Sequence, residues 1–344
     1  MNLFWAALLL TAPAHALQQN VGTVAAQFLT IGAGARSLGM AGAYTAIAEG
    51  PEAIYWNPAG MAAMKSPEAA YSLTQLPAGI MHNFAAAAAP SEFLHGDIGV
   101  AFTSLTQPGQ DLVTASNQTV GSFAPHSEAY ALSYAHRFTL GGEDSSLGRS
   151  AMDREWLMPG ADKPLGDDAQ PSAPIAGTLD AGLAVKYIDE NLGTRAAGTT
   201  AVDAGAIFRP AAAPDLIFGA AVRNLGGQLR YIDVSEPLPS EIGASAAYAF
   251  RGAGWRLLPA LDVSIPYAGN PYVKFGVEYY RALGDNAWGG LRLGYTSQPA
   301  VDLGVVAGLT AGIGLRVNRF LFDAAFEPMT YLGDEYRISA GWRF

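Results

Sequence analysis

The amino-acid sequence predicts an all-β fold, a transmembrane barrel of 14 antiparallel strands with an N-terminal hatch inside it. Apolar and polar residues alternate with a period of two from residue 67 to the end of the chain. Half of the 344 residues are apolar and only 15% are charged, too few charges for the exterior of a soluble sheet protein. Ahead of the alternating region lies a glycine-rich apolar segment that has no strand pattern and suits the lumen of a barrel.

The first 16 residues predict a secretory signal peptide. Residues 3–10 form a compact apolar run, and Ala14-His15-Ala16 is an A-x-A cleavage site, so we expect the mature chain to begin at residue 17. A transmembrane helix is the alternative, but polar residues 18–20 end the run short of the ~20 apolar residues that a span requires. A later apolar run, 303–315, has only 13 residues and contains glycines. We therefore expect export to the outer membrane of a Gram-negative-type bacterium.

Alternation is clearest in the last strand, where one face is apolar and the other is polar. Successive side chains of a strand point to opposite faces, so this sheet has one apolar face and one polar face. A soluble sandwich also alternates, but here the polar face carries mainly glycine, alanine and single charges, and aromatic residues lie near strand ends on the apolar face. This pattern favours a barrel whose apolar face meets lipid. The aromatic positions are Tyr187, Phe208, Tyr248, Phe250, Tyr279, Tyr295, Trp342 and Phe344.

The alternating segments number 14, an even number, as single-chain bacterial barrels require. If both termini face the periplasm, the connections 106–127, 190–199, 225–239, 297–303 and 328–334 face outward and are mostly the longer ones. Segment 139–177 is an exception, because it is long but follows an even-numbered strand and would therefore face the periplasm. It is interpreted as an inserted mobile module or as a partner-docking loop. The predicted strands are 69–76, 80–90, 95–105, 128–138, 178–189, 200–210, 214–224, 240–251, 255–265, 272–281, 287–296, 304–317, 319–327 and 335–344.

The segment 34–62 predicts a plug rather than a strand pair. Its glycines permit close backbone approach, and Asn57 followed by Pro58 is a good helix start, with Asn57 as N-cap. The helix should be short and end near Ala63. We therefore divide the mature chain into a hatch, 17–66, and a barrel, 67–344.

The same residues resemble a known family. The runs GARSLGMAGAYTA at 34–46 and IYWNPAG at 54–60, together with the aromatic terminal strand, resemble the PorV/PorQ family and, more distantly, the FadL family of outer-membrane transporters. The resemblance implies a 14-stranded outer-membrane barrel with an N-terminal hatch. FadL-type members pass long-chain fatty acids or other hydrophobic compounds, whereas PorV is a component of the type IX secretion apparatus. The positions that match the hatch motif are Arg36, Gly39, Gly42, Asn57, Pro58 and Gly60.

Charged residues on the polar face predict an ion-pair network that braces the barrel and holds the hatch. Isolated charges in a dry interior are costly, so these side chains must pair or meet water. A selectivity ring is the alternative, and Arg36 is a candidate partner for one of the lumen carboxylates. The inward charges are Asp97, Arg137, Asp180, Lys186, Asp203, Arg209, Arg223, Asp262, Lys274, Glu278, Arg292, Arg316, Asp323, Arg337 and Arg343.

The sequence offers no enzyme chemistry. It contains no cysteine, and the mature chain's four histidines (82, 95, 126 and 136) lie at no metal-ligand spacing, so we expect no metal and no cofactor. A net charge of −10 argues against nucleic acid. A lipase is the remaining enzyme alternative, without motif support.

Two functions therefore compete. The first is a plugged conduit for hydrophobic small molecules, and the second is a barrel that docks periplasmic or secreted proteins through 106–127 and 139–177. Expected partners are outer-membrane lipid and the outer-membrane assembly machinery. The assembly machinery would read the last strand through Tyr336, Ile338, Trp342 and Phe344.

Overall fold

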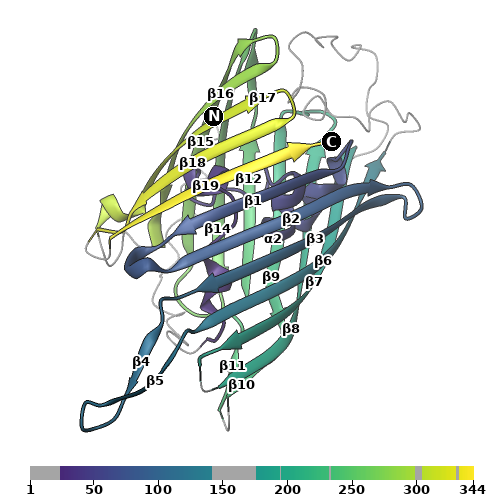
Figure 1. The fold of residues 1–344 in the computed structure, drawn as a ribbon. Coiled ribbons are helices and arrows are strands. Elements are labelled where there is room, and N and C mark those ends of the chain that lie inside the picture. Colours follow the sequence, from purple (N-terminus) through teal and green to yellow (C-terminus); the bar gives the residue numbers. More distant parts are fainter. Residues whose placement is uncertain (1–23, 142–175, 194, 232–233, 299–303, 331–332) are drawn as a thin grey trace.

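The computed structural model describes residues 24–141, 176–193, 195–231, 234–298, 304–330 and 333–344. The signal peptide and most of the 139–177 insertion lie outside the described residues. Figure 1 shows strands tilted around one axis, with the N-terminal segment enclosed between them. No helix in the described ranges is long and apolar enough to span a membrane.

The strands close into one antiparallel barrel. Beginning at β1, neighbours in the sheet follow chain order, β19 pairs back with β1, and β12 pairs with β14. The short β13 (Phe250–Gly252) pairs only with β14 and continues β12 beyond Ala249, so the ring has 14 members, as predicted. The wall consists of β1 (Glu68–Gln75), β2 (Met81–Ser91), β3 (Gly96–Thr106), β6 (His126–Leu140), β7 (Gly177–Asn191), β8 (Ala196–Pro210), β9 (Leu216–Gly226), β12 (Glu241–Tyr248), β14 (Trp255–Pro266), β15 (Tyr272–Gly284), β16 (Ala287–Thr296), β17 (Leu309–Val317), β18 (Phe320–Pro328) and β19 (Asp334–Arg343).

Every neighbouring pair of wall strands is joined by an antiparallel ladder, so the described strands leave no unpaired seam in the wall. The register between β8 and β9 shifts once, where Val202 faces Leu225 and Ala204 faces Val222. The shift coincides with Asn224, whose φ is +55° and whose backbone N–H donates to Asp203 Oδ1 over 2.7 Å. A bulge of this kind bends the strand without opening the sheet.

The two ends of the barrel differ. At one end, which we call the hairpin end, two hairpins extend from the wall: β4 (Gln110–Val113) with β5 (Thr119–Phe123), and β10 (Gln228–Tyr231) with β11 (Val234–Pro237). The other end, which we call the turn end, holds the tight Asn318 turn and the C-terminal residue. Both hairpins lie within predicted loops, 106–127 and 225–239, and were not predicted as strands.

Two predicted strands need correction. The segment 304–308 is not strand, because Gly304 has φ of +90° and Val305–Gly308 forms a 3₁₀ helix, η7, before β17 begins. The predicted strand 240–251 is divided at Ala249 into β12 and β13, although the Ala249 N–H donates to the Asp215 carbonyl in register with β9 and the register against β14 is the same on both sides. Apolar alternation continues through both places, so the pattern alone conceals the breaks.

The outside of the wall is apolar and the inside is polar, as alternation predicts. Outward side chains such as Leu293 (68% exposed) and Ile338 (57%) are open to the surroundings, whereas inward Arg292 and Asp180 are buried. A continuous apolar exterior of this extent requires lipid or detergent around it. The alternation therefore defines a transmembrane barrel wall.

The N-terminal segment fills the lumen with short helices. They are η3 (Gln27–Thr30), α1 (Ala35–Gly39), η4 (Gly50–Glu52), α2 (Ala53–Trp56) and η5 (Pro58–Ala63). We name residues 24–34 the strap and residues 35–63 the plug body. The strap begins at the hairpin end, where the Ala25 N–H donates to the Pro237 carbonyl of β11, and the plug body leads to β1.

Candidate functional site

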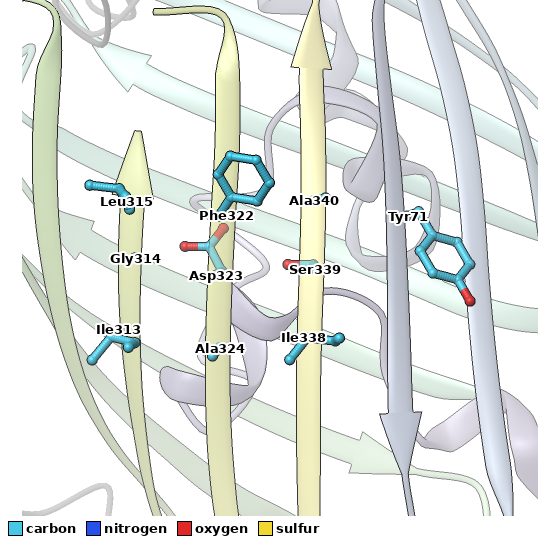
Figure 2. Close-up of a pocket in the computed structure, with 10 residues that line it drawn as sticks. All are labelled: Tyr71, Ile313, Gly314, Leu315, Phe322, Asp323, Ala324, Ile338, Ser339 and Ala340. Carbon is cyan, nitrogen blue, oxygen red and sulfur yellow. The ribbon is translucent and has the colours of Figure 1, made fainter. Parts of the chain in front are cut away.

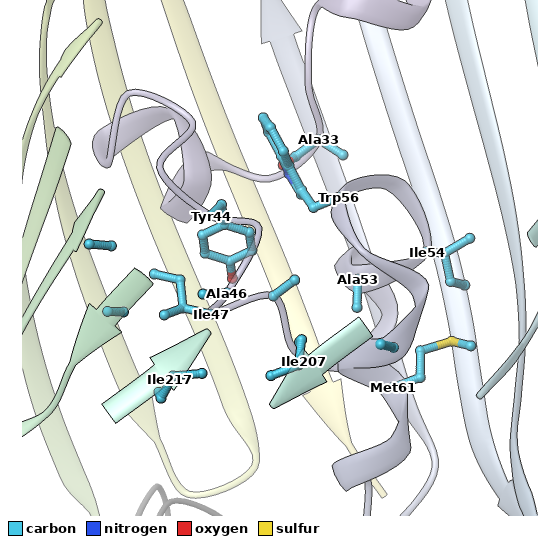
Figure 3. Packing of buried hydrophobic residues seen from close by; sticks show 14 of the residues in the cluster. Ala33, Tyr44, Ala46, Ile47, Ala53, Ile54, Trp56, Met61, Ile207 and Ile217 are labelled. Atoms are coloured by element: carbon cyan, nitrogen blue, oxygen red, sulfur yellow. The ribbon is translucent and has the colours of Figure 1, made fainter. Parts of the chain in front are cut away.

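The candidate site is the interface between the hatch and the wall, and it begins with the apolar centre of the plug body. Tyr44 and Trp56 meet edge to face, 6.0 Å between ring centres, and the Trp56 indole N–H donates to the Ala33 carbonyl over 2.8 Å. Figure 3 shows Tyr44 and Ile47 on the side of the plug body nearest wall residues Ile207 and Ile217, and Ile54 with Met61 on the opposite side. The apolar residues of 34–62 are thus removed from water by the wall.

Asn57 and Pro58 form the corner that was predicted as a helix start. Asn57 Oδ1 accepts from the Ala59 N–H over 3.2 Å, and Pro58 is the first residue of η5. The helix ends at Ala63 as expected, but it is 3₁₀ rather than α. Asn57 Nδ2 also donates to the Thr45 carbonyl over 2.8 Å and to the Ala206 carbonyl of β8 over 3.2 Å. This corner therefore joins the hatch to the wall through hydrogen bonds of one side chain.

Glycines on the inner face of the wall let the hatch backbone come very close. A Cβ at Gly205 would lie 1.9 Å from Asn57 Oδ1, and a Cβ at Gly182 would lie 2.3 Å from the Pro58 carbonyl carbon. Real side chains do not approach so closely, so these positions exclude alanine unless the hatch shifts. The same relation holds for Gly219 against Ala46, Gly276 against Met40, and Gly294 against Ala41, and a Cβ at Gly312 would make a tight contact of 3.1 Å with Gly39. Within the hatch, a Cβ at Gly60 would lie 2.1 Å from the Ala48 carbonyl oxygen.

Arg36 lies against a lumen carboxylate, and that carboxylate is Glu278 of β15. The Arg36 Nε and one of its NH₂ groups donate to the two carboxylate oxygens of Glu278 over 2.7 and 2.9 Å, a bidentate arrangement. The other NH₂ group donates to Glu49 over 2.5 Å and to the Tyr44 hydroxyl over 3.1 Å. Arg36 thus connects α1 to the wall and to the next loop of the hatch.

Glu278 is the centre of a larger network. Besides Arg36 it accepts from Arg256 over 2.6 Å and from Arg292 over 2.8 Å. Arg292 also pairs with Asp323 of β18 over 2.7 Å. A buried carboxylate needs such compensation, because removing one partner of a buried pair typically costs about 3–5 kcal/mol. The network ties four wall strands to the hatch.

A second group of charges surrounds Trp56. Arg223 of β9 donates to the Trp56 carbonyl over 3.1 Å and pairs with Glu241 over 2.6 Å. Lys274 of β15 lies 3.6 Å from the same Glu241 carboxylate and 5.7 Å from the centre of the Trp56 ring. Gly42, with φ of +73°, passes between this ring and the Lys274 side chain.

Among the other lumen charges, Asp262 of β14 binds the hatch, because its Oδ2 accepts from the Tyr44 and Thr45 N–H groups over 3.2 and 3.0 Å. Further charges brace the wall itself. Asp180 of β7 pairs with Arg137 of β6 and Arg209 of β8, each over 2.6 Å. Lys186 pairs with Asp203 over 2.7 Å. Neighbouring strands are therefore cross-linked by charge, an arrangement of mutual pairs rather than an open ring of one sign.

The strap is held differently, by hydrogen bonds and by an apolar cluster in which Phe28 and Leu29 pack with wall and hairpin residues Ile188, Leu229 and Leu238. Arg337 of β19 donates to the Ile31 carbonyl over 2.6 Å and to the Gly34 carbonyl over 3.3 Å, and it pairs with Glu335 over 2.7 Å. The Gly32 N–H donates to the Tyr55 hydroxyl. Figure 1 places the start of the strap beneath the β10–β11 hairpin, where Gln27 and Thr30 are exposed.

One buried acid of the hatch, Glu52, has a raised pKa. Burial, and secondarily the charge of Asp323, raises the pKa of Glu52 from 4.5 to about 7 against the opposing effect of Arg36. Glu52 borders a small polar cavity of about 50 Å³ between the hatch loop and strands β1, β18 and β19, which Glu49, Glu68 and Asp323 also line. Glu49, by contrast, has its pKa lowered, because the charges of Arg36, Arg316, Arg343 and Arg256 together outweigh the effect of burial.

The four residues predicted as an assembly signal, Tyr336, Ile338, Trp342 and Phe344, are exposed on the outer face of the last strand. The same face carries a shallow apolar hollow of about 380 Å³. Figure 2 shows its lining, with the side chains of Phe322, Ile338 and Tyr71 around a floor of Ala324 and Ala340. The hollow lies over β1 and β17–β19.

Sequence reasoning missed several residues of the network, among them Glu49, Glu241, Arg256 and Tyr280. Glu241 opens β12 on the inward face and follows the alternation, so the pattern contained the signal. Glu49 lies in the hatch, where no sequence periodicity indicates which way a side chain points. Tyr280, whose hydroxyl accepts from Arg292, faces inward where alternation predicts a polar residue.

No family model and no curated protein sequence matches the chain. Solved structures do match in fold. The toluene transporter TbuX of Ralstonia pickettii aligns with a TM-score of 0.53 and 11% identity over 91% of this chain and 98% of TbuX. The Pseudomonas putida toluene transporter TodX gives 0.55 and 9% over 91% and 99%. A Pseudomonas aeruginosa FadL homologue gives 0.51 and 11% over 90% and 98%. The chain thus has the fold of a FadL-like, 14-stranded barrel with an N-terminal hatch.

Proposed function

We propose that the protein is a plugged outer-membrane channel for hydrophobic small molecules, in which the strap is the gate. The carrying observation is the unequal attachment of the hatch. Ion pairs and close glycine contacts lock the plug body to the wall. The strap is held by hydrogen bonds and by the packing of Phe28 and Leu29 in an apolar cluster with the wall, and its described residues make no ion pair. Displacing the strap breaks no ion pair of its own, so it opens at lower free energy than the plug body.

The direction of transport follows from the predicted export. With the C-terminal residue in the periplasm, the turn end faces the periplasm, the hairpin end faces outward, and the strap meets incoming molecules first. The fold likeness to toluene transporters and to a FadL homologue supports a hydrophobic cargo. The closed ladder of the wall supports a route that begins in the lumen rather than through a seam. We also propose that the assembly machinery reads the exposed aromatic face of β19.

Native mass spectrometry of the purified barrel tests the proposal. We expect an adduct of fatty acid or detergent that survives removal of the micelle and is displaced by an added hydrocarbon. Uptake of a radiolabelled hydrocarbon into vesicles containing lipopolysaccharide should exceed uptake into protein-free vesicles. A barrel without adducts, with uptake equal to that of protein-free vesicles, would refute the channel.

The second candidate is a PorV-like barrel that docks a protein. The β4–β5 hairpin favours it, because nearly all its residues are exposed, including Val113 (55%) and Val120 (61%). A lone two-stranded hairpin is marginally stable in water. Val113→Ser with Val120→Ser should abolish crosslinking of a specific protein at the cell surface and leave hydrocarbon uptake unchanged. Loss of uptake without loss of a crosslink would exclude docking.

A further inference from the structure

Three polar side chains form a row on the inner wall beside the strap. Thr74 of β1 faces His82 of β2 on one side and Arg337 of β19 on the other in the strand register. Figure 1 shows these three strands side by side. Because paired residues share one level, the side chains of Thr74, His82 and Arg337 lie in sequence across the wall, and we call them the polar row.

The polar row is buried without being satisfied. Thr74 and His82 are 0% exposed and Arg337 is 1% exposed. Among the described residues, Thr74 Oγ1, both ring nitrogens of His82, and Arg337 Nε have no hydrogen-bond partner. Buried polar atoms are almost always paired, so a concentration of orphaned donors and acceptors at one level needs a reason.

The strap covers this place. Arg337, one member of the row, donates to the Ile31 and Gly34 carbonyls. The Gly34 N–H donates to Ser72 Oγ, and Ser72 precedes Thr74 by two residues on the same face of β1. Displacement of the strap would therefore release the Arg337 NH₂ groups and open the row to the lumen.

The surroundings define the chemistry of a ligand. Arg337 is already neutralised by Glu335 over 2.7 Å, and Glu327 of β18 faces Glu335 in the register, so an additional carboxylate would be repelled. The His82 imidazole, buried beside a guanidinium, is unfavourable as a cation. Phe84 follows His82 on the inner face of β2, and its ring meets Tyr55 with 6.4 Å between centres. The site thus joins aromatic surface to neutral hydrogen-bonding groups.

We propose that the polar row binds the hydroxyl group of an uncharged phenolic compound once the strap has moved. The hydroxyl donates to a ring nitrogen of His82 and accepts from Thr74 Oγ1–H or Arg337 Nε–H, while the ring contacts Phe84 and Tyr55. This inference rests on the proposed channel function and narrows its substrates. It makes Thr74 and His82 specificity-determining residues, distinguishing phenols from hydrocarbons of the same size.

Fluorine NMR with a matched pair of ligands tests the proposal. The protein in lipid nanodiscs is titrated with 4-fluorophenol and with fluorobenzene, and empty nanodiscs provide the background. Thr74→Val and His82→Leu should weaken 4-fluorophenol binding about fivefold or more, the loss of roughly one hydrogen bond, and leave fluorobenzene binding unchanged. The control is Thr178→Val, whose hydroxyl is equally buried and orphaned but lies on β7 at the turn end.

The outcomes distinguish failure of the proposed hydroxyl site from failure of the proposed channel function. If both ligands bind and neither substitution distinguishes them, the polar row is not a hydroxyl site, although the channel stands. If neither ligand binds above empty nanodiscs, the channel and the site both fail. Heat-modifiable gel mobility verifies folding, and Thr74→Val, which is nearly isosteric, decides the question if His82→Leu does not fold.

Discussion

The strap and the plug body belong to one continuous segment, yet the wall holds them in different ways. The plug body contacts glycines of six wall strands and inserts Arg36 between Glu278 and Glu49. No wall glycine makes such a contact with the described residues of the strap, which is held by hydrogen bonds to Arg337, Ser72, Glu190 and the β11 carbonyl and by an apolar cluster around Phe28 and Leu29. The kind of attachment therefore changes from ion pairs and backbone contacts in the middle of the lumen to hydrogen bonds and apolar packing at the hairpin end.

For the proposed channel, this difference separates a seal against ions from a gate for hydrophobic molecules. A buried ion network and close backbone contacts make the plug body costly to move. Displacing the strap breaks hydrogen bonds worth about 1 kcal/mol each and exposes the apolar cluster around Phe28 and Leu29, but it breaks no ion pair made by the strap's described residues. We infer that the body is the seal and the strap is the gate, and the predictions below separate the two roles.

The largest expected effect is from Gly205→Ala in the wall. The new Cβ would lie 1.9 Å from Asn57 Oδ1, so the Asn57 corner must move and the plug body loses its fit. We expect destabilisation of about 3 kcal/mol and a rise in ion conductance across planar bilayers. Gly341→Ala is the control, because its Cβ would have only ordinary contacts at 3.5 Å. Equal conductance of both variants would show that the close contact is unimportant.

The next effect is from Arg36→Ala in α1. Glu278 would keep Arg256 and Arg292 but lose its bidentate partner, and Glu49 would lose its charge partner. We expect docking of the plug body to weaken by about 2 kcal/mol and bilayer conductance to increase. Conductance identical to that of the unaltered protein would contradict the role of Arg36 as a lock.

A smaller and different effect is expected from Arg337→Gln at the strap. The strap loses hydrogen bonds to the Ile31 and Gly34 carbonyls, worth about 2 kcal/mol together. Hydrocarbon uptake should rise severalfold while ion conductance stays at its basal level. Arg343→Gln, which breaks an ion pair with Glu68 at the turn end of the same strand, should leave uptake unchanged. A rise in ion conductance in the Arg337→Gln variant would contradict the distinction between the plug body as seal and the strap as gate.

The smallest effect is a pH dependence of the plug body through Glu52. Its pKa is raised from 4.5 to about 7 in the docked hatch, where it faces Asp323, Arg36, Arg292 and Arg337. Docking of the plug body therefore takes up a proton at Glu52. The contribution of Glu52 to the stability of the docked state is fully present below pH 4.5 and is lost as the pH rises through 7. Leak openings in bilayers should be more frequent at pH 8 than at pH 5. Glu52→Gln should flatten this profile, and an unchanged profile would exclude Glu52 as its source.

The wall was predictable because its signal is local. In a strand, each residue's face follows from that of its neighbour, and lipid outside forces the apolar residues onto one face. Alternation thus gave the fourteen strands and the inward direction of Asp180, Arg209 and Arg292. It failed at 304–308, where the backbone forms a 3₁₀ helix while the apolar pattern continues. The β4–β5 hairpin was not predicted because no buried face shapes its sequence, and β10, which buries Leu229, is too short to show alternation.

The hatch was predictable only in part. The Asn57–Pro58 corner has a local signature, and the structure places it at the start of η5. The partner of Arg36 is 242 residues away, and no period connects a hatch residue to one strand among fourteen. The orphaned ring of His82 is likewise a property of packing, because sequence spacing shows only that this histidine has no metal-ligand neighbour.

Disulfide locks test the division between gate and seal most directly, since the chain has no cysteine of its own. Ala25→Cys with Pro237→Cys would tie the strap to β11, where the Ala25 N–H now donates to the Pro237 carbonyl over 3.0 Å. Thr45→Cys with Gly243→Cys would tie the plug body to β12, where a Cβ at Gly243 would lie 3.3 Å from Thr45 Oγ1. The measurement is hydrocarbon uptake into vesicles before and after reduction. We predict that the strap lock stops uptake until it is reduced and that the body lock leaves uptake intact. Uptake that persists with the strap locked and stops with the body locked would contradict the account.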